Sequence, residues 1–402
     1  MTGRGLRGEA AIVGYAEWPA ERRYDGERQF TLEQWSDLAA QALEDAGLEP
    51  DRMDGLVCSD IREASMFVPA TVAEYLGRPV NFAERIDLGG ATAVGMVWRA
   101  AAAIELGICD VVVCALPSRP IPSNPDKGPP DPRKWLGSSS GDWGSPQAEF
   151  ELPYGNVAQN AGYAMIARRY AETFGFDPRA LARISADQRS NACANPAAAF
   201  HGQPISVDDV LDSPMIADPL HRLEIVMPCA GGAAVVLASA ETAARCRHRP
   251  VRVTGFGEHL TIKTPTYAED MTTTPVAAAA RGAFAMAGRT PAEMDAAQIY
   301  DCYTITVLLS LEDAGFCAKG QGCDFLREHD LTHAGDFPLN TGGGQLGFGQ
   351  AGLAGGMVQV VEGARQAMGR GEQHQVKDCE RVFVTGTGGV MSEQSALVLE
   401  GG

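Results

Sequence analysis

The sequence predicts an α/β fold built from two copies of one folding unit. The segment AIVGYAE, which ends at Glu17, returns 241 residues later as VRVTGFGE, which ends at Glu258. Residues 42–54 and 283–295 match at the same offset and share Ala, Ala, Gly, Pro, Met and Asp. Solenoid repeats have periods of about 20–50 residues, so a period this long indicates a duplicated domain-sized unit.

Strand-like and helix-like segments alternate through the first copy. A helical stretch over 31–47 follows the first strand, and MDGLVCSD reads as a short buried strand. An Ala-rich helix over about 92–107 precedes CDVVVCAL, a β-branched run typical of a strand buried on both faces. This alternation predicts a parallel sheet with right-handed crossovers.

The chain divides into two predicted halves, 1–245 and 246–402. The first carries an insertion at about 117–215, which begins with a loop over 117–154 rich in Pro, Gly, Ser and Asp. A loop this long inside a compact domain is usually functional, so we expect it and the two helices after it to cover a site. In the second half, a Gly-rich turn at 340–356 leads into a helix and the strand CERVFVTG, which echoes CDVVVCAL.

Composition excludes several classes of partner. The 402 residues carry a formal charge of −18, which argues against nucleic acid and anionic membranes but leaves room for a phosphorylated small ligand. Ten cysteines occur without CxxC pairs or a zinc-like Cys/His spacing, so we expect no metal site. The sequence shows no signal peptide and no apolar run of the ~20 residues that span a bilayer, which predicts a cytoplasmic protein.

Four segments resemble motifs of the thiolase superfamily, especially its sterol-carrier-protein branch, and the resemblance covers nearly the whole chain. They are DLGGATAVGM before the Ala-rich helix, YDCY, LNTGGGQLGFGQA and GTGGVM. The resemblance implies the thiolase fold, in which two pseudo-equivalent βαβαβ-type halves form five layers, α-β-α-β-α. The insertion of loop and helices then belongs to the first half.

The motifs keep their glycines but lack the chemical groups of thiolases. Thiolases use a nucleophilic Cys at a helix N-terminus, a His in a GHP turn and a second Cys in a CxGGG turn. In this chain the matching positions are Gly90, Gln350 and Gly386, and Tyr300 stands where the branch motif HDCF has its His. The chain therefore lacks the groups that thiolytic catalysis requires.

Thiolase-like steroid side-chain aldolases also lack the nucleophilic Cys, and the resemblance to them implies a retro-aldol cleavage of a 3-hydroxyacyl-CoA. Tyr300 looks like one of their proton-transfer tyrosines, whereas Phe348 and Gln350 occupy the turn where a second one is expected. Because the unperturbed pKa of Tyr is about 10 and Asp301 would raise it, we expect a relay or general-acid role for Tyr300. The predicted catalytic residues are Tyr300, Gln350 and Asp301.

Backbone donors and pocket residues complete the predicted site. Glycines at tight turns offer N–H groups that can form an oxyanion hole for a thioester enolate. The candidates for this role are Gly90, Gly344, Gly386 and Gly388, and the possible pocket residues are Cys302, Tyr303 and Phe348. A CoA thioester is expected as substrate, with no covalently bound cofactor.

Plainer interpretations stay open beside these. The alternative for Tyr300 is an ordinary strand-end aromatic, for Cys229 and Cys302 a buried structural thiol, and for His201 a solvated loop residue. Two other functions also remain: a divergent acyltransferase that uses a Cys in another register, and a non-catalytic scaffold. The resemblance further implies a homodimer and a small partner protein with an OB fold and a zinc ribbon.

Overall fold

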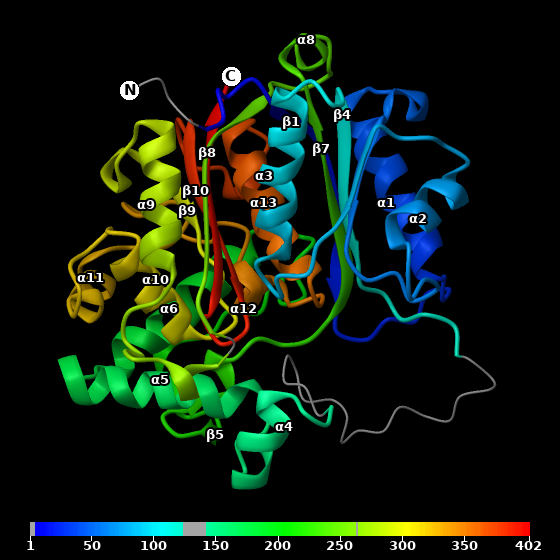
Figure 1. Ribbon diagram of the computed structural model, residues 1–402. Coiled ribbons are helices and arrows are strands. Elements are labelled where there is room, and N and C mark those ends of the chain that lie inside the picture. The colour runs from blue at the N-terminus through cyan, green and yellow to red at the C-terminus, as the bar shows by residue number, and fades with distance from the viewer. Residues whose placement is uncertain (1–4, 124–141, 263) are drawn as a thin grey trace.

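The computed structural model describes residues 5–123, 142–262 and 264–402, which form five layers of helices and sheet (Figure 1). Two central helices lie between two half-sheets, and further helices cover the outer faces. The predicted α-β-α-β-α arrangement is therefore confirmed. Within the described ranges, no helix is both long and apolar enough to cross a membrane.

The two half-sheets contain related sets of strands. The first has the order β3 (Phe82–Arg85), β2 (Gly55–Cys58), β4 (Val111–Pro117), β7 (Ala230–Ala238) and β1 (Ala11–Glu21). The second continues with β8 (Val251–Leu260), β11 (Glu393–Gly401), β10 (Arg381–Gly388) and β9 (Ala296–Gln298). Only Ala11 and Ile12 of β1 pair with β8, so a short contact joins the halves into one nine-stranded sheet.

The sheet is mixed, which corrects the parallel sheet predicted from the alternation of segments. Strand β2 runs parallel to β3 and β4, and β9 runs parallel to β10. Strands β7 and β11 are antiparallel to both of their neighbours. Every residue of β7 is buried, so its apolar run looks like that of a parallel strand and does not reveal its direction.

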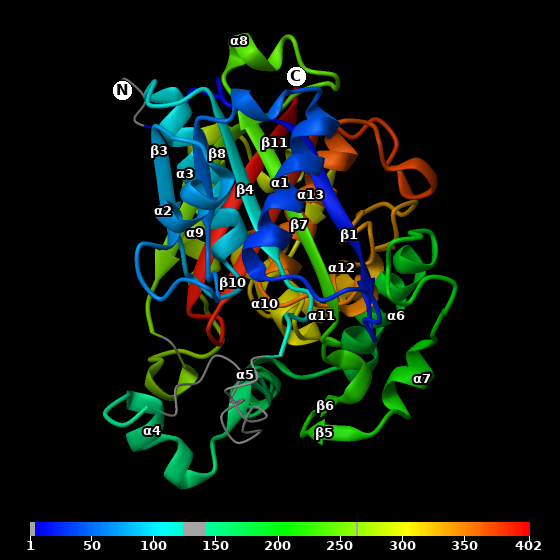
Figure 2. The same cartoon turned by 90° about the vertical axis from the view of Figure 1, so that its right-hand side faces the viewer.

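The helices lie in three layers, one on each outer face of the sheet and one between the two half-sheets. The outer face of the first half-sheet carries α1 (Thr31–Ala46) and α2 (Val68–Leu76), and Figure 2 shows α1 lying across β4 and β7. The outer face of the second carries α9 (Val276–Ala287), with α10 (Thr304–Asp313) and α11 (Gly322–Glu328) beside it. The central layer consists of α3 (Thr92–Glu105) and α13 (Ala354–Ala367).

The described part of the insertion lies at one end of the molecule, where α6 packs against α10 and α12 (Figure 1). Residues 124–141 of the predicted covering loop lie outside the described residues. The elements here are α4 (Pro146–Phe150), α5 (Ala158–Phe174), α6 (Pro178–Cys193), α7 (Val207–Leu211), β5 (Met215–Ala217), β6 (Leu220–His221) and, from the second half, α12 (Gly344–Phe348). The remaining short elements are α8 (Ala240–Ala243), η1 (Pro50–Arg52), η3 (Leu152–Tyr154), η4 (Arg222–Glu224), η5 (Pro265–Tyr267), η6 (Pro291–Glu293) and η7 (Glu372–His374).

Repeated glycines explain part of the sequence duplication. A Cβ on Gly14 of β1 would lie 2.7 Å from the backbone oxygen of Ala42 in α1. A Cβ on Gly255 of β8 would lie 2.2 Å from the backbone oxygen of Ala283 in α9. Gly14 and Gly255 are 241 residues apart in sequence, and so are Ala42 and Ala283. The same close contact between a helix and a strand therefore occurs in each half.

A repeated aspartate fixes the start of an inner strand in each half. The Asp54 carboxylate accepts a hydrogen bond from the backbone N–H of Val111 at 2.8 Å, where β4 begins. The Asp295 carboxylate accepts one from the backbone N–H of Arg381 at 2.8 Å, where β10 begins. The domain boundary predicted at 245/246 falls between α8 and β8 and stays a prediction.

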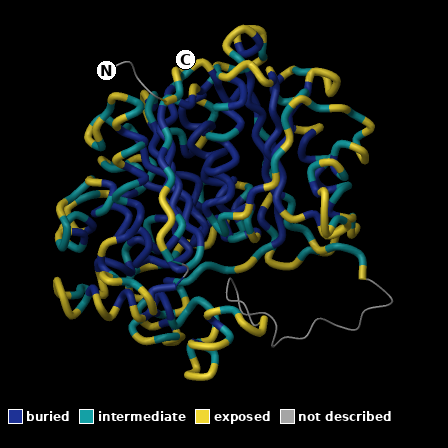
Figure 3. Tube along the Cα trace, in the orientation of Figure 1, coloured by how far each residue is buried: buried dark blue, intermediate teal, exposed yellow. Residues whose placement is uncertain are grey.

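The core follows the layers (Figure 3). The buried residues gather in the strands and the central helices, and all fourteen residues of α13 are buried. Separate apolar clusters lie under α1, under α9 and between α5, α6 and α10. The loops that end near α3 and α13 therefore meet on a rigid, buried scaffold.

Candidate active site

The phenol of Tyr300 fills the space beside Gly90. A Cβ on Gly90 would lie 2.2 Å from Tyr300 Oη and 2.3 Å from the backbone oxygen of Thr387. Gly90 lies directly before α3, Tyr300 follows β9, and Thr387 belongs to β10. Loops of both halves thus meet at this point, and the position leaves no room for a side chain on residue 90.

Gln350 lies in hydrogen-bond contact with the same phenol. Its Nε2 donates to Tyr300 Oη at 3.3 Å. Its backbone is fixed on both sides, because Gln350 N–H donates to the Met227 oxygen at 2.9 Å and Cys229 N–H donates to the Gln350 oxygen at 2.8 Å. The structure therefore brings three of the predicted site residues together, Gly90, Tyr300 and Gln350.

The N-termini of the two central helices converge here. A Cβ on Gly356, in the first turn of α13, would lie 2.7 Å from the Gly90 oxygen and 3.6 Å from the Tyr300 ring. A Cβ on Gly386 would lie 3.2 Å from the same Gly90 oxygen. Because helix N-termini carry partial positive charge, the convergence of α3 and α13 favours an anion beside Tyr300.

Two of the predicted oxyanion glycines lie in a strand. Gly386 and Gly388 belong to β10 and pair with Ser395 and Glu393 of β11, so their assignment to a turn is wrong. The strand extends further than the glycine content suggests because β11 pairs with it to its last residue. The turn that follows contains two residues with left-handed backbone, Gly389 with a φ of +60° and Met391 with a φ of +56°.

Asp301 holds the Gly-rich turn in place. Its Oδ1 accepts hydrogen bonds from Gln345 N–H and Gln359 Nε2, both at 2.8 Å, and its Oδ2 accepts one from Leu346 N–H at 3.0 Å. Gly344 is required beside it, because a Cβ there would lie 2.3 Å from Asp301 Oδ2. Complete burial raises the pKa of the Asp301 carboxyl to about 7, although the two backbone donors oppose this rise. Both oxygens are occupied, so the carboxylate positions the turn.

Tyr300 is a neutral phenol at physiological pH. Burial raises its pKa well above 10, and the neighbouring Cys302 and Asp301 raise it further. The hydrogen bond from Gln350 lowers the pKa but does not offset the burial. A protonated phenol can donate or relay a proton, and this role of Tyr300 stays a prediction.

Comparisons with known proteins identify the family. A family model described as "Thiolase C-terminal domain-like" matches residues 257–401. The chain is 33% identical to a "Steroid side-chain-cleaving aldolase" of Thermomonospora curvata, over 98% of each chain. It is 32% identical to a "17-hydroxy-3-oxo-4-pregnene-20-carboxyl-CoA lyase" of Mycobacterium tuberculosis, over 98% of this chain and 100% of that one. The chain belongs to the thiolase superfamily.

Among solved structures, the "Ltp2-ChsH2(DUF35) aldolase" superimposes with a TM-score of 0.86 and 31% identity, covering 99% of both chains. These relatives place the chain in the aldolase and lyase branch of the thiolase superfamily. The Tyr300 phenol occupies the space beside Gly90, and the match of Gly90 to the thiolase nucleophile position stays a prediction.

The other predicted pocket residues face the insertion. Tyr303 Oη donates to Asn160 at 2.5 Å, and its ring stacks on Tyr163 of α5 at 4.0 Å. Cys302 Sγ contacts Tyr163 Oη at 3.3 Å, and burial raises the pKa of this thiol to about 12. Phe348 is buried in α12. Tyr303 and Cys302 therefore lie beside α5, whereas Phe348 lies in the core. The role of all three in a pocket stays a prediction.

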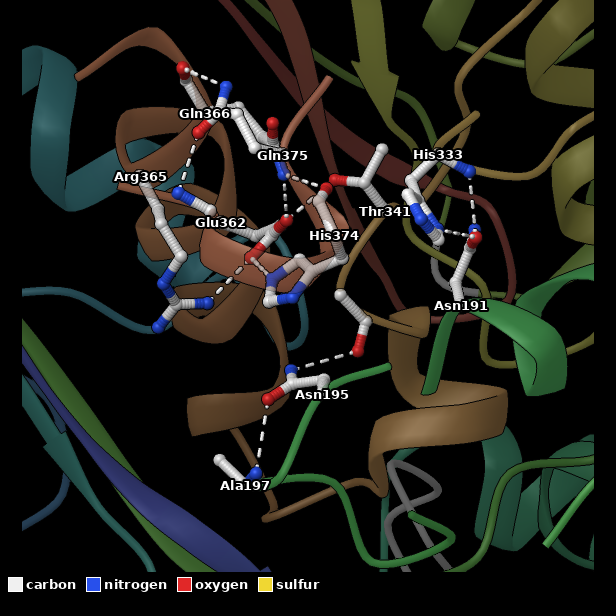
Figure 4. A network of polar contacts seen from close by, with 12 residues as sticks. Asn191, Asn195, Ala197, His333, Thr341, Glu362, Arg365, Gln366, His374 and Gln375 are labelled. Carbon is white, nitrogen blue, oxygen red and sulfur yellow. Dashed lines mark hydrogen bonds and ion pairs between the residues drawn. The ribbon is translucent and has the colours of Figure 1, made fainter. Parts of the chain in front are cut away.

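A buried ion-pair network behind the Gly-rich turn was missed by sequence reasoning (Figure 4). Glu362 accepts hydrogen bonds from Thr341 Oγ1 at 2.6 Å and from Arg365 Nη1 at 2.5 Å. Asn195 Nδ2 donates to the Gly342 oxygen at 3.0 Å. Burial raises the pKa of the Glu362 carboxyl, but Arg365 and the hydrogen bonds from His374 and Gln366 outweigh it and hold this pKa far below its usual range. The only signal in the sequence was charge within an otherwise apolar helix.

Two hollows lie in the part of the molecule around the β10–β11 turn and α13. One of about 640 Å³ lies behind the β10–β11 turn and the start of α9, and Ile166, Met271, Ala278, Val390 and Met391 contribute to its lining. Another of about 410 Å³ lies beside Arg365 and Arg370. Among the described residues, no group of three or more His, Cys, Asp or Glu side chains could hold a metal ion.

Proposed function

We propose that this protein is a carbon–carbon lyase that cleaves a 3-hydroxyacyl-CoA thioester by a retro-aldol reaction without a covalent enzyme intermediate. The observation that carries the proposal is the Tyr300 phenol lying where a nucleophile on residue 90 would project. A covalent acyl-enzyme needs a thiolate at that place. A retro-aldol reaction needs only proton transfer and a stabilised enolate oxygen.

The chemistry balances without an oxidant or a second substrate. The O–H bond of the tertiary alcohol breaks and its oxygen becomes a ketone, while the electrons of the adjacent carbon–carbon bond form the thioester enolate. Protonation of the enolate α-carbon then gives the shortened acyl-CoA. Tyr300 relays the alcohol proton to the enolate α-carbon: its neutral phenol gives its own proton to the carbon and takes the proton of the alcohol, while the hydrogen bond from Gln350 holds the phenol in place.

The names of two relatives and an apolar hollow support a substrate class. Two relatives are named for steroid side-chain cleavage and for a pregnene carboxyl-CoA. The hollow of about 640 Å³ is lined in large part by apolar side chains and lies behind the β10–β11 turn, whose strand residue Thr387 contacts the Gly90 position. We infer that the substrate carries a steroid or similarly bulky apolar ring system.

The solved relative, an aldolase paired with ChsH2(DUF35), supports a partner protein for this chain. We infer that this chain also works with a small protein containing an OB fold and a zinc ribbon, within an assembly built on a homodimer. Co-expression followed by mass determination of the purified complex tests this. A chain that stays alone and is fully active contradicts it.

A direct assay tests the activity. Incubation of the chain, with and without its partner, with a 17-hydroxy steroid propionyl-CoA should give propionyl-CoA and the 17-ketone in equal amounts. Free CoA should not appear, because no thioester is hydrolysed or transferred. A complex that yields neither product contradicts the proposal and favours a scaffold.

A further inference from the structure

Gln345 is a buried side chain with unused hydrogen-bonding groups. It is 1% exposed and lies in the first turn of α12, inside the Gly-rich segment. Neither its Nε2 nor its Oε1 makes a hydrogen bond with any residue that the structure describes. Buried polar groups are nearly always paired, so an unpaired amide at this place calls for a ligand.

The unpaired amide lies inside the Tyr300 site. A Cβ on Gly355 would lie 2.4 Å from Gln345 Oε1 and 3.3 Å from Gln350 Cγ, so the two glutamine side chains adjoin the same point of α13. The following residue, Gly356, lies against the Gly90 oxygen and the Tyr300 ring. Two consecutive glycines therefore make room for both amides and the phenol at the N-terminus of α13.

The backbone of Gln345 is fixed although its side chain is unpaired. Its N–H donates to Asp301 Oδ1 at 2.8 Å, which anchors the residue beneath the site. Burial raises the pKa of Tyr300 and of Asp301, and the Gln345 side-chain amide lies close enough to both groups to lower each pKa slightly. An amide in this position presents N–H donors to a developing negative charge.

The retro-aldol reaction places that negative charge on the thioester oxygen. We propose that Gln345 is a catalytic residue whose Nε2–H donates to this oxygen as the enolate forms. Gln350 already donates to Tyr300, so Gln345 supplies a separate donor to the same reaction centre. This inference rests on the proposed lyase function and adds a residue that the motif positions did not indicate.

Gln188 provides a matched control. It is fully buried in α6, and both of its side-chain polar atoms also lack partners among the described residues. The inference assigns a catalytic role to Gln345 alone. Replacement of either amide by Met removes an unpaired buried polar group, which should leave the melting temperature unchanged or raise it.

The experiment measures kcat, KM and melting temperature for Gln345→Met and Gln188→Met in the complex with its partner protein. Gln345→Met should lose about 10²- to 10³-fold in kcat, the effect of removing one oxyanion donor, with KM nearly unchanged. Gln188→Met should stay within about 2-fold of the wild type, since an amide outside the site makes no contact in the transition state. If Gln345→Met fails to fold, Gln345→Ala replaces it.

Two outcomes overturn the inference. Either the Gln345 variant keeps its kcat, or it loses activity together with a fall in melting temperature that Gln188→Met does not show, which marks a structural role. Turnover by the wild-type complex is the separate test of the lyase function. A wild type that is active beside an unaffected Gln345→Met therefore overturns this inference alone.

Discussion

Two buried polar clusters lie near the Gly-rich turn, and they differ in how fully their groups are paired. The paired cluster consists of Thr341, Glu362, Arg365 and Gln366, in which Glu362 accepts hydrogen bonds from the other three. The open cluster consists of Tyr300, Gln345 and Gln350, which share one 3.3 Å hydrogen bond between Gln350 and Tyr300.

This difference in pairing suggests that the paired cluster supports the fold and that the open cluster takes part in the reaction. A fully paired buried network rigidifies the backbone that it contacts, and here it fixes the turn through Thr341. Unpaired buried groups reduce stability and are retained mainly where a ligand completes them. Changes in the paired cluster should therefore act on stability, and changes in the open cluster should act on turnover.

The largest stability effect is expected from Glu362→Gln. Loss of this charge leaves Arg365 with one buried carboxylate, that of Glu17, and removal of one partner of a buried pair costs about 3–5 kcal/mol. Urea unfolding measures the change in free energy. The control is Glu380→Gln, which breaks the exposed pair with Arg249 and should cost about 0–1 kcal/mol. Equal effects of the two substitutions would show that the network does not support the turn.

The largest effect on turnover is expected from Tyr300→Phe. Loss of the relay should lower kcat by about 10²- to 10⁴-fold with little change in unfolding free energy. Gly90→Ala should cause a similar loss, because its Cβ would lie 2.2 Å from Tyr300 Oη and displace the phenol. The kcat values of both single variants and of the double variant, measured by steady-state kinetics, give a double-mutant cycle.

The double variant decides whether the two positions act as one unit. If Gly90 matters only because it makes room for the phenol, the double variant loses no more than Tyr300→Phe alone. Additive losses would mean that the two positions act independently. Tyr303→Phe is the control, since its hydroxyl bonds Asn160 and should affect kcat far less.

Much of this comparison could be predicted from the sequence, because the duplication fixes the register. Gly14 and Gly255 occupy equivalent positions of the two repeats, because each lets an outer helix approach a strand closely. This repeated position made the two-half fold predictable. The motif glycines then located Gly90 and Gln350, which the structure brings to Tyr300.

The rest depends on contacts between residues distant in the chain. Arg365 pairs with Glu17 across a separation of 348 residues, and no local pattern indicates such a partner. Gln345 was missed because a polar residue in a Gly-rich turn is ordinarily solvated. The directions of β7 and β11 were missed because burial on both faces removes the alternation that marks many antiparallel strands.

Asp301 anchors the open cluster through the backbone N–H of Gln345 and should make stability depend on pH. Its folded pKa of about 7 lies above the unfolded value of about 3.9. Its stabilising contribution is therefore fully present below pH ~4 and is lost as pH rises through ~7. Relative to Asp301→Asn, the wild type should lose on the order of 1.4 kcal/mol for each unit of pKa difference. Urea unfolding of both proteins between pH 4 and pH 8 measures this, and a constant difference would contradict it.

The smallest effect is expected from thiol alkylation, which sharpens the contrast with thiolytic enzymes. The two cysteines beside the site are Cys229, whose Sγ would contact a Cβ on Gly349, and Cys302 of the YDCY segment. Burial raises their pKa values to about 11 and about 12, so near pH 7 only about one Cys229 thiol in 10⁴ and about one Cys302 thiol in 10⁵ is ionised. Iodoacetamide reacts with the thiolate, and treatment of the native complex should therefore change kcat by less than about 2-fold.

Peptide mass spectrometry after the same treatment identifies which of the ten cysteines react. Labelling at the more accessible thiols, such as Cys193 and Cys246, with full activity retained agrees with a non-covalent mechanism. Complete inactivation by a single modified cysteine, prevented by bound acyl-CoA, would instead reveal a nucleophilic thiol. The chain would then be an acyltransferase, and the Tyr300 phenol would have to serve a thiolate in place of an enolate.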